Sequence, residues 1–395
     1  MAGMGLSLVT PFLPLYIDTL GNFNQATLSF WSGATIAVPF LMTAIVSPLW
    51  GRLADRSGRK LMLLRAAAGM AVIMLLTGFV TNVYELLALR FLFGMFSGFI
   101  SNATALIASQ VPKKESGRVL GTLNTAGIGG MLLGPVFGGV AATFLGYAHV
   151  FILTGIILGL VFLFSLWRVK EDFTPVPRAE MQGWRELLAN LKNRRLVIGM
   201  LGVTLLVALM ANTVNPVLSL FVREILPAGG NVELWAGAAA AAPGLTTMLL
   251  GARLGALGDR IGTHKIMLGG LVVAAVVFIP MFFVNQVWQL IALRLGLGVG
   301  MAVLLPGAQT LLTRNTPQKA ISRIFAYNQS AQAMGSVFGP LIGAAVGGML
   351  DFHYVFLAAF AFALLNFFVT LFSSREPAPA AGGGGGGGGS GGGEG

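Results

Sequence analysis

Two arginines lie within long apolar stretches, Arg90 in LALRFLFG and Arg294 in IALRLGLG. A guanidinium in such a place is costly unless water, a carbonyl oxygen or an anion lies beside it. The group can then assist proton transfer or bind an anion. Each side chain can instead extend to the nearer edge of its stretch, because Glu85 and Gln289 suggest that both helices begin close by. For both arginines, a functional role and a contact at the membrane surface remain alternatives.

Carboxylates are suited to proton coupling, because their pKa moves with burial and with a bound substrate. The acids of this chain avoid the centres of the apolar stretches. Asp18, Glu85, Glu224 and Asp351 fall at their ends, and Asp55 and Asp259 fall between them. Asp18 is the first candidate for a titrating group, with Arg90 as a nearby modulator. The alternative for Asp18 is an acid that ends a helix at the membrane surface.

The elements that position these residues follow from the composition. Of 395 residues, 55% are hydrophobic and 10% are charged, whereas an ordinary soluble domain carries about 25% charged residues. A helix that crosses a bilayer needs roughly 20 apolar residues, so the chain has room for about a dozen spans. Zero cysteines exclude disulfides, thiol chemistry and cysteine metal sites. The sequence predicts an all-α polytopic membrane protein that needs no metal and no other cofactor.

Apolar runs between clusters of charged and turn residues predict twelve transmembrane helices. They lie near residues 2–20, 31–50, 61–80, 84–108, 118–142 and 148–168, and then near 196–222, 233–254, 266–285, 287–312, 320–349 and 352–373. We therefore expect an N-terminal half at 1–168, a polar central loop at 169–195 and a C-terminal half at 196–376. Residues 377–395 form a flexible tail rich in proline, alanine and glycine.

Basic residues orient the bundle. Of 25 lysines and arginines, 22 fall on one side of the predicted spans, and the net charge is +11. Since positive residues collect in cytoplasmic loops, that side and both termini are predicted to face the cytoplasm. This placement explains the positive charge without a nucleic-acid partner.

The two halves repeat one another. Asp55 and Asp259 lie 204 residues apart, as do Arg90 and Arg294. The pairs Thr10-Pro11, Gly134-Pro135 and Val150-Phe151 recur 205 residues later as Asn215-Pro216, Gly339-Pro340 and Val355-Phe356. Two parallel six-helix halves place a substrate site between them, near the bilayer midplane. The same offset maps the start of the seventh helix to a position before Met1, so the first helix looks truncated.

The segment GRLADRSGRK, from Gly51 to Lys60, joins the second and third predicted helices. Gly58 permits a tight turn, and Asp55 can meet a helix N-terminus or a basic partner. The segment resembles the cytoplasmic loop motif of the major facilitator superfamily, whose fold has twelve transmembrane helices in two pseudo-symmetric halves. The resemblance implies a latch that holds the outward-facing arrangement; its residues are Gly51, Asp55, Arg56, Gly58 and Arg59. The alternative is a basic loop and nothing more.

In the fifth predicted helix, GIGGMLLGPVFGG places Gly130, Gly134, Gly138 and Gly139 around Pro135. Small residues let helix backbones approach closely, and proline permits a kink. The pattern resembles the antiporter motif of the drug:proton antiporter group, which occurs in exporters. The alternative is ordinary packing of small residues without a direction of transport.

The fourth predicted helix carries Arg90 in RFLFGMFSG. This pattern resembles the arginine and glycine motif of the same group, although Phe93 stands where glutamine is usual. The resemblance implies that Arg90 takes part in proton transfer.

Polar side chains inside the predicted helices outline a cavity between the halves. Candidates for its polar wall are Asn102, Asn124, Asn212, Asn215, Gln309, Asn328 and Gln332, and candidates for its aromatic wall are Phe12 and Tyr16. They come mainly from the first, second, fourth and fifth helices of each half, the set that the resemblance places along the pathway. Each polar residue can instead form a hydrogen bond to a neighbouring helix.

Residues 1–376 resemble a branch of the multidrug efflux transporters, through stretches such as LADRSGRKLMLLR, NATALIASQVPKKESGRVLGTL and IFAYNQS. The resemblance implies a monomeric secondary transporter in the bacterial inner membrane that exports small lipophilic, amphipathic drugs by alternating access, in exchange for protons. One alternative keeps the fold and exports an anionic metabolite or a sugar-like solute. A second alternative is a membrane enzyme or a receptor-like protein, although the chain has no paired histidine ligands and no phosphate-binding loop.

Overall fold

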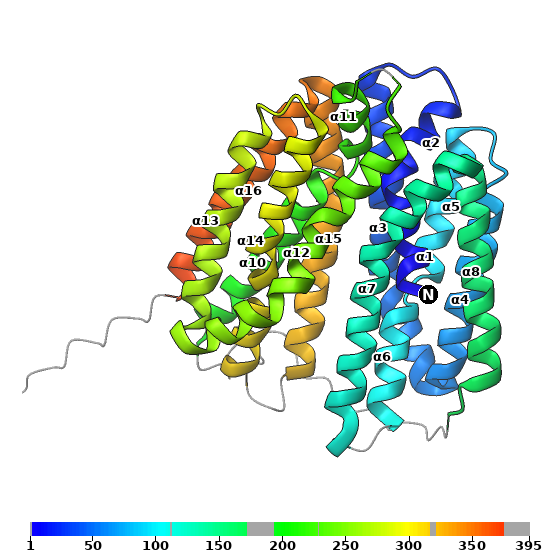
Figure 1. Cartoon of the computed structure of the whole chain (residues 1–395). Coiled ribbons are helices and arrows are strands. Elements are labelled where there is room, and N and C mark those ends of the chain that lie inside the picture. Colours follow the sequence, from blue (N-terminus) through cyan, green and yellow to red (C-terminus); the bar gives the residue numbers. More distant parts are fainter. Residues whose placement is uncertain (1, 111–112, 172–192, 228, 317–320, 375–395) are drawn as a thin grey trace, which may run out of the picture.

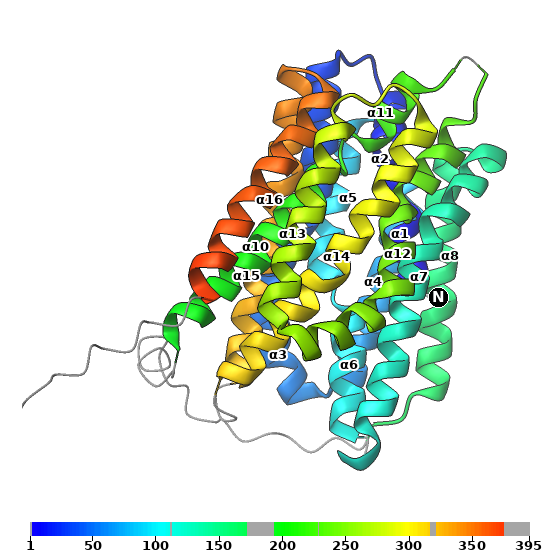
Figure 2. The same cartoon turned by 60° about the vertical axis from the view of Figure 1, so that its left-hand side comes forward.

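The computed structural model describes residues 2–110, 113–171, 193–227, 229–316 and 321–374. In these ranges the chain forms long helices joined by short turns, and the helices run side by side in a two-lobed bundle (Figures 1 and 2). Nine helical segments of the described ranges are long and apolar enough to cross a membrane.

The N-terminal lobe holds the first six spans. They are a broken span of α1 (Ala2–Leu8), η1 (Thr10–Phe12) and α2 (Leu13–Thr19), then α3 (Gln25–Ser57), α4 (Arg59–Thr77), a broken pair of α5 (Val83–Phe96) and α6 (Phe99–Gln110), α7 (Lys113–Leu145) and α8 (Tyr147–Arg168). Helix α1 begins partway along the height of the bundle (Figure 1).

The C-terminal lobe repeats the arrangement. It contains a broken pair of α10 (Arg194–Thr213) and α11 (Leu218–Ile225), then α12 (Val232–Ile261), α13 (Thr263–Met281), α14 (Val287–Asn315), α15 (Ile321–Met349) and α16 (Phe352–Ser374). With each broken helix counted once, the described chain has the twelve spans that the sequence predicts. Most of the predicted central loop and the whole predicted tail fall at residues 172–192 and 375–395, outside the described ranges.

Proline and glycine account for the breaks in the helices. The first span breaks at Pro11 and the seventh at Pro216, the two prolines that the internal repeat pairs. Proline lacks the amide hydrogen that would continue the helical hydrogen bonds. The fourth span breaks at Ser97 and Gly98, where Gly98 has φ of 110°, a conformation that favours glycine.

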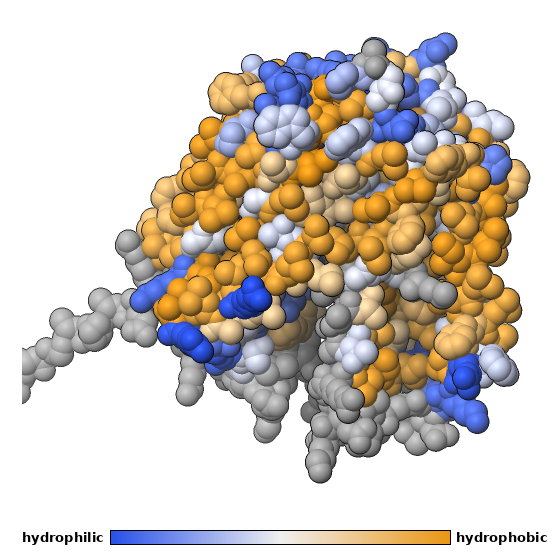
Figure 3. Space-filling model, in the orientation of Figure 1, coloured by the Kyte–Doolittle hydropathy of each residue, from blue (hydrophilic) through white to orange (hydrophobic). Residues whose placement is uncertain are grey.

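The two ends of the bundle differ in charge. We call the end where α3 meets α4 at Gly58 and α12 meets α13 at Gly262 the basic end. We call the opposite end, which carries Asp18, Glu224 and Asp351, the acidic end. Between them, apolar side chains cover most of the face of the molecule that Figure 3 shows. Large exposed apolar side chains such as Phe144 and Trp167 fit contact with lipid in a multi-pass membrane protein.

Candidate functional site

The glycines of the predicted antiporter motif let α7 lie directly against α1. A Cβ atom added at Gly130 would lie 2.8 Å from the backbone nitrogen of Met4, and one added at Gly134 would lie 2.7 Å from the Met4 carbonyl oxygen. At Gly138 it would collide with the Leu8 carbonyl group. The two backbones touch over this length because these positions carry no side chain.

The same motif joins the two halves at the acidic end. A Cβ atom added at Gly139 would lie 2.7 Å from the carbonyl oxygen of Glu233 in α12. One added at Gly237 of α12 would collide with the carbonyl oxygen of Pro135. The structure thus places all five motif residues at two helix interfaces, one within the N-terminal half and one between the halves.

The copy of this motif in α15 forms a second interface between the halves. A Cβ atom added at Gly348 would lie 3.1 Å from the Ala26 Cα atom in α3, and one added at Gly33 of α3 would lie 2.8 Å from the Pro340 carbonyl oxygen. The Gln25 side chain donates a hydrogen bond to the Gly347 carbonyl oxygen at 3.0 Å. The pairs α7–α12 and α3–α15 therefore form a pseudo-symmetric closure, which we call the acidic-end interface.

Two polar links join the halves beside this interface. Arg223 Nη1 in α11 lies 2.6 Å from Asp18 Oδ2 in α2, with the side chains 44% and 32% exposed. The Tyr147 hydroxyl group in α8 donates to Glu233 Oε1 in α12 at 2.7 Å. Asp18 thus lies at the acidic end as predicted, but the sequence shows no sign of its partner Arg223 or of the Tyr147–Glu233 pair.

Arg90 is buried among apolar groups in the N-terminal half. It is 6% exposed, so it does not extend to the edge of the membrane. Its guanidinium carbon lies 5.6 Å from the Phe93 ring centre and 5.3 Å from that of Phe151, and Nη2 lies 4.0 Å from the Met74 sulfur atom. Arg90 Nε has no hydrogen-bond partner among the described residues. Aromatic faces and a thioether thus surround this cation.

Arg294, the repeat copy of Arg90, is 7% exposed and also does not extend to the edge. Its environment differs, because its Nε donates to the Ala239 carbonyl oxygen of α12 at 2.6 Å.

Several predicted cavity residues form a polar seam between α10 and α15. Thr204 donates to Asn328 Oδ1 at 2.7 Å, and Asn328 is buried. Asn212 Nδ2 donates to the Ala208 carbonyl oxygen at 2.8 Å and to Ser336 Oγ at 3.4 Å. Asn215 Nδ2 in turn donates to Asn212 Oδ1 at 3.0 Å. For Asn212 and Asn328 the structure shows hydrogen bonds between helices, the alternative to a place in the cavity wall.

The two aromatic candidates for the cavity wall are buried in this structure. Phe12 is 1% exposed and fills the space beside Gly138 and Gly237. Tyr16 is 4% exposed, donates to the Thr77 carbonyl oxygen at 2.9 Å and packs against Phe151. Phe12 turns into the packed interior because Gly138 and Gly237 on neighbouring helices leave room there. Among the other candidates, Gln309 is exposed and Asn102 and Gln332 are half-buried, and the Asn124 side chain lies outside the described part.

The predicted latch lies at the basic end. Gly58 has φ of 90° and turns α3 into α4, whereas Gly51 lies on an exposed face of α3. The side chains of Asp55 and Arg56 lie outside the described part. The backbone N–H groups of Arg59 and Lys60 donate to the two oxygens of Glu171, at 2.8 and 2.7 Å. Glu171, which the sequence did not single out, therefore caps α4 and ties it to the end of α8.

Arg65 is a second residue that sequence reasoning missed. It was counted with the basic side, but it lies within α4 and faces the break between α5 and α6. Its guanidinium carbon lies 3.7 Å from the Trp50 ring centre, and Nη2 donates to the Ser97 carbonyl oxygen at 3.2 Å. Arg65 satisfies a backbone carbonyl that the end of α5 leaves without a helical partner.

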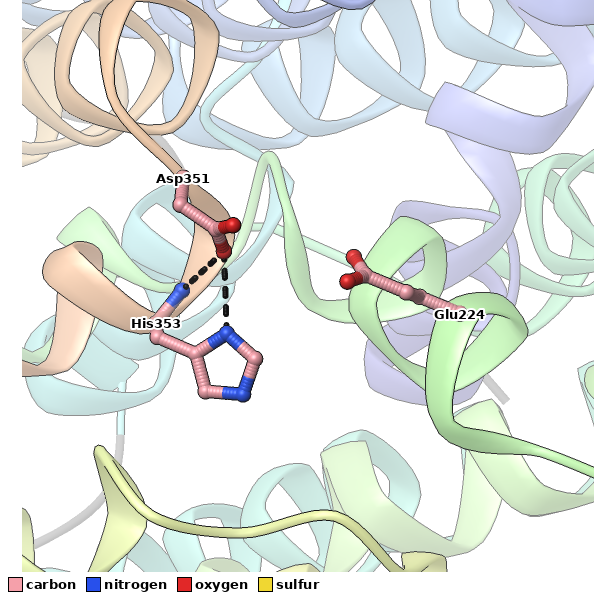
Figure 4. A group of neighbouring side chains, drawn as sticks. All are labelled: Glu224, Asp351 and His353. Carbon is pink, nitrogen blue, oxygen red and sulfur yellow. Dashed lines mark hydrogen bonds and ion pairs between the residues drawn. The ribbon is translucent and has the colours of Figure 1, made fainter.

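One cluster at the acidic end holds groups that metals use. Glu224, Asp351 and His353 each offer a ligand atom, all within 4.8 Å of one another (Figure 4). His353 Nδ1 lies 2.9 Å from Asp351 Oδ1, and Nε2 lies 3.1 Å from the Val284 carbonyl oxygen. Both ring nitrogens thus face oxygen acceptors. The hydrogen bond from His353 holds the pKa of the Asp351 carboxyl below its usual value, and the cluster fits a cap at the start of α16.

The sequence is similar to known transporters over most of its length. Residues 1–225 and 200–390 match the Major Facilitator Superfamily. The multidrug resistance proteins MdtG of Salmonella heidelberg and Salmonella typhimurium are each 45% identical to this chain over 366 residues, which cover 93% of this chain and 91% of each relative. This result confirms the predicted resemblance to a branch of the multidrug efflux transporters.

Solved structures share the fold at low sequence identity. A bacterial homolog of the human lysosomal transporter Spinster, in an inward-facing and occupied conformation, has a TM-score of 0.76 over 95% of this chain and 94% of its own. A variant of the nucleoside transporter NupG has a TM-score of 0.70 over 95% of this chain and 98% of its own. Both are 15% identical to this chain. The predicted major facilitator fold is confirmed, the alternative of a membrane enzyme is set aside, and the chain belongs to the major facilitator superfamily of transporters.

Proposed function

We propose that the chain is a secondary active transporter that exports amphipathic drugs by alternating access, in exchange for protons. The relatives named for multidrug resistance support the substrate class, because their similarity covers nearly the whole chain. The distribution of basic residues supports a bacterial inner-membrane protein whose basic end and termini face the cytoplasm. We expect it to act as a monomer.

The acidic-end interface is the observation that carries the transport cycle. The described contacts between the halves at α7–α12 and α3–α15 are made through glycines at backbone distance and lie toward the acidic end. With the basic end in the cytoplasm, these contacts close the outer side, and we propose that the protein opens toward the inside. The glycine-rich helix faces stabilise the closed state through close backbone contact. They can also separate easily, because no large side chains interlock between them.

Asp18 and Arg90 are the proposed coupling groups. Every carboxylate whose side chain the structure describes lies near a helix end. Asp18 and Glu233 both join the halves, and Asp18 is the one whose partner, Arg223, is a cation. Its ion pair with Arg223 joins the two halves, so we expect the pair to break when the acidic end opens. Protonation of Asp18 removes the charge that holds Arg223, so it favours opening to the outside. Arg90, a buried cation in the same half, is the second proposed group.

The alternative cargo is an anionic metabolite. The observation in its favour is the pair of buried arginines, Arg90 and Arg294, neither of which has an ion-pair partner among the described side chains. A binding site for an anion would use such a cation without a central carboxylate.

Transport by the purified protein in liposomes separates the two cargoes. An imposed pH gradient is combined with either tetraphenylphosphonium, a lipophilic cation, or a radiolabelled organic anion. Drug:proton antiport predicts cation flux that requires the gradient and stops when an ionophore collapses it. Flux of the anion alone supports the alternative. Absence of both fluxes, in protein that remains folded, contradicts the proposal.

A further inference from the structure

Helix α12 contains a backbone carbonyl without its helical partner. Pro243 lies inside α12 and has no N–H group, so the Ala239 carbonyl oxygen, four residues earlier, loses the hydrogen bond of a regular helix. Arg294 Nε donates to this oxygen at 2.6 Å from α14. The buried cation and the unpaired carbonyl therefore satisfy one another, which removes the cost of burying either one alone.

Two further contacts lock α14 against the same proline. A Cβ atom added at Gly298 would lie 2.9 Å from the Pro243 Cα atom, so the backbones meet where glycine leaves space. Thr247 Oγ1 in α12 donates to the Gly298 carbonyl oxygen at 3.0 Å. We call Pro243, Thr247, Arg294 and Gly298 the α12 clamp.

The N-terminal half contains the same four residue types 204 positions earlier, as Pro39, Thr43, Arg90 and Gly94. The backbone contacts are matched, because a Cβ atom at Gly94 would lie 2.8 Å from the Pro39 Cα atom and Thr43 Oγ1 lies 3.1 Å from the Gly94 carbonyl oxygen. The arginine differs, since Arg90 faces Met74 and aromatic rings and its Nε is unpaired. The repeat thus supplies one clamp with its arginine bound and one without.

Arg294 binds α12 at Ala239, two residues after Gly237 of the acidic-end interface. Pro243 separates the acidic-end segment of α12, which carries Glu233 and Gly237, from the rest of the helix. These two residues meet Gly139 and Pro135 of α7. We infer that Arg294 is a positioning residue: by occupying the carbonyl that Pro243 frees, it fixes the bend of α12 and thereby the fit of α12 against α7. Arg90, which makes no such bond, is left to the transport chemistry.

A double-mutant cycle on thermal unfolding tests the bond. Pro243→Ala restores an N–H group for the Ala239 carbonyl, so it removes the need for Arg294. The double variant with Arg294→Met and Pro243→Ala should therefore unfold at a higher temperature than the sum of the two single effects predicts. The expected difference in midpoint is on the order of 5 °C. The matched cycle of Arg90→Met with Pro39→Ala should be additive. Additivity in both halves, or equal coupling in both, would overturn the inference.

A distance measurement tests the positioning. The chain has no cysteine, so spin labels at Phe79→Cys and Phe283→Cys report one distance between exposed, repeat-related sites at the acidic ends of the two halves. Arg294→Met should shift or broaden this distance distribution, and adding Pro243→Ala should restore it. An unchanged distribution contradicts the inference. If Arg294→Met alone does not fold, the expected result is recovery of folded protein by Pro243→Ala, and no recovery contradicts it. Both measurements are independent of drug transport, so they can fail or succeed separately from the proposed function.

Discussion

Gly139 offers the sharpest perturbation of the acidic-end interface. In Gly139→Ala the new methyl group would lie 2.7 Å from the Glu233 carbonyl oxygen and 3.4 Å from the Leu234 Cα atom. An ordinary contact needs about 3.4 Å or more, so α7 and α12 must separate by about 0.7 Å at this point. Overpacking of this kind costs about 1–3 kcal/mol. The cost falls on the closed state alone, because the two helices part when the acidic end opens.

The expected result is a shift of the conformational equilibrium. A bias of about 1–3 kcal/mol changes the ratio of open to closed molecules by roughly 5- to 150-fold. Spin labels at Phe79→Cys and Phe283→Cys should show a longer component in Gly139→Ala than in the parent. Gly251→Ala, in α12 with nothing within 4 Å of the added methyl group, is the matched control and should leave the distribution unchanged. The same distribution in Gly139→Ala and in the parent would refute the assignment of this contact to the closed state.

Three further predictions concern single side chains. Asp18→Asn should change the pH dependence of drug efflux. It should alter the free energy of unfolding by less than about 1 kcal/mol, because the pair with Arg223 is exposed. An efflux profile identical to that of the parent would remove Asp18 from proton coupling. Glu171→Gln should lower the thermal unfolding midpoint, because a neutral amide replaces the carboxylate that caps α4. The expected loss in free energy of unfolding is about 0.5–2 kcal/mol. Glu171→Asp is the control that keeps the charge, and equal midpoints in Glu171→Gln and the parent would contradict the cap. For Asp351, whose pKa is lowered from 3.8 mainly by the His353 hydrogen bond, the contribution to stability is present above about pH 4 and lost as the pH falls through the lowered pKa. Asp351→Asn should therefore have a lower thermal unfolding midpoint than the parent at pH 7, and the two midpoints should become equal under acid conditions. A constant difference in midpoint across this range would exclude the lowered pKa as its cause.

The sequence alone predicts the number and approximate bounds of the spans well, because hydrophobic length is a local property. The twelve spans and the turn at Gly58 follow from residue types that act on their own backbone. The breaks at Pro11 and Pro216 were not predicted, although the repeat pairs these two prolines. The repeat also predicts that α15 carries a copy of the small-residue face of α7.

Contacts between distant segments could not be predicted in this way. Whether Arg223 meets Asp18 depends on how the two halves tilt, which no local pattern records. Phe12 was assigned to the cavity because it is aromatic, but Gly138 and Gly237 leave a space that it fills instead. The difference between Arg90 and Arg294 is invisible in their nearly identical surroundings in the sequence, because it depends on which neighbour each guanidinium reaches.

Proton movement in response to drug is the most direct test of the proposed exchange. Liposomes that contain the purified protein and an internal pH-sensitive dye are given an outward gradient of a lipophilic cation and no initial pH gradient. Antiport predicts that efflux of the cation drives protons inward, so the internal pH falls, and that Asp18→Asn weakens this change. Efflux of the cation without any change of internal pH would contradict proton exchange.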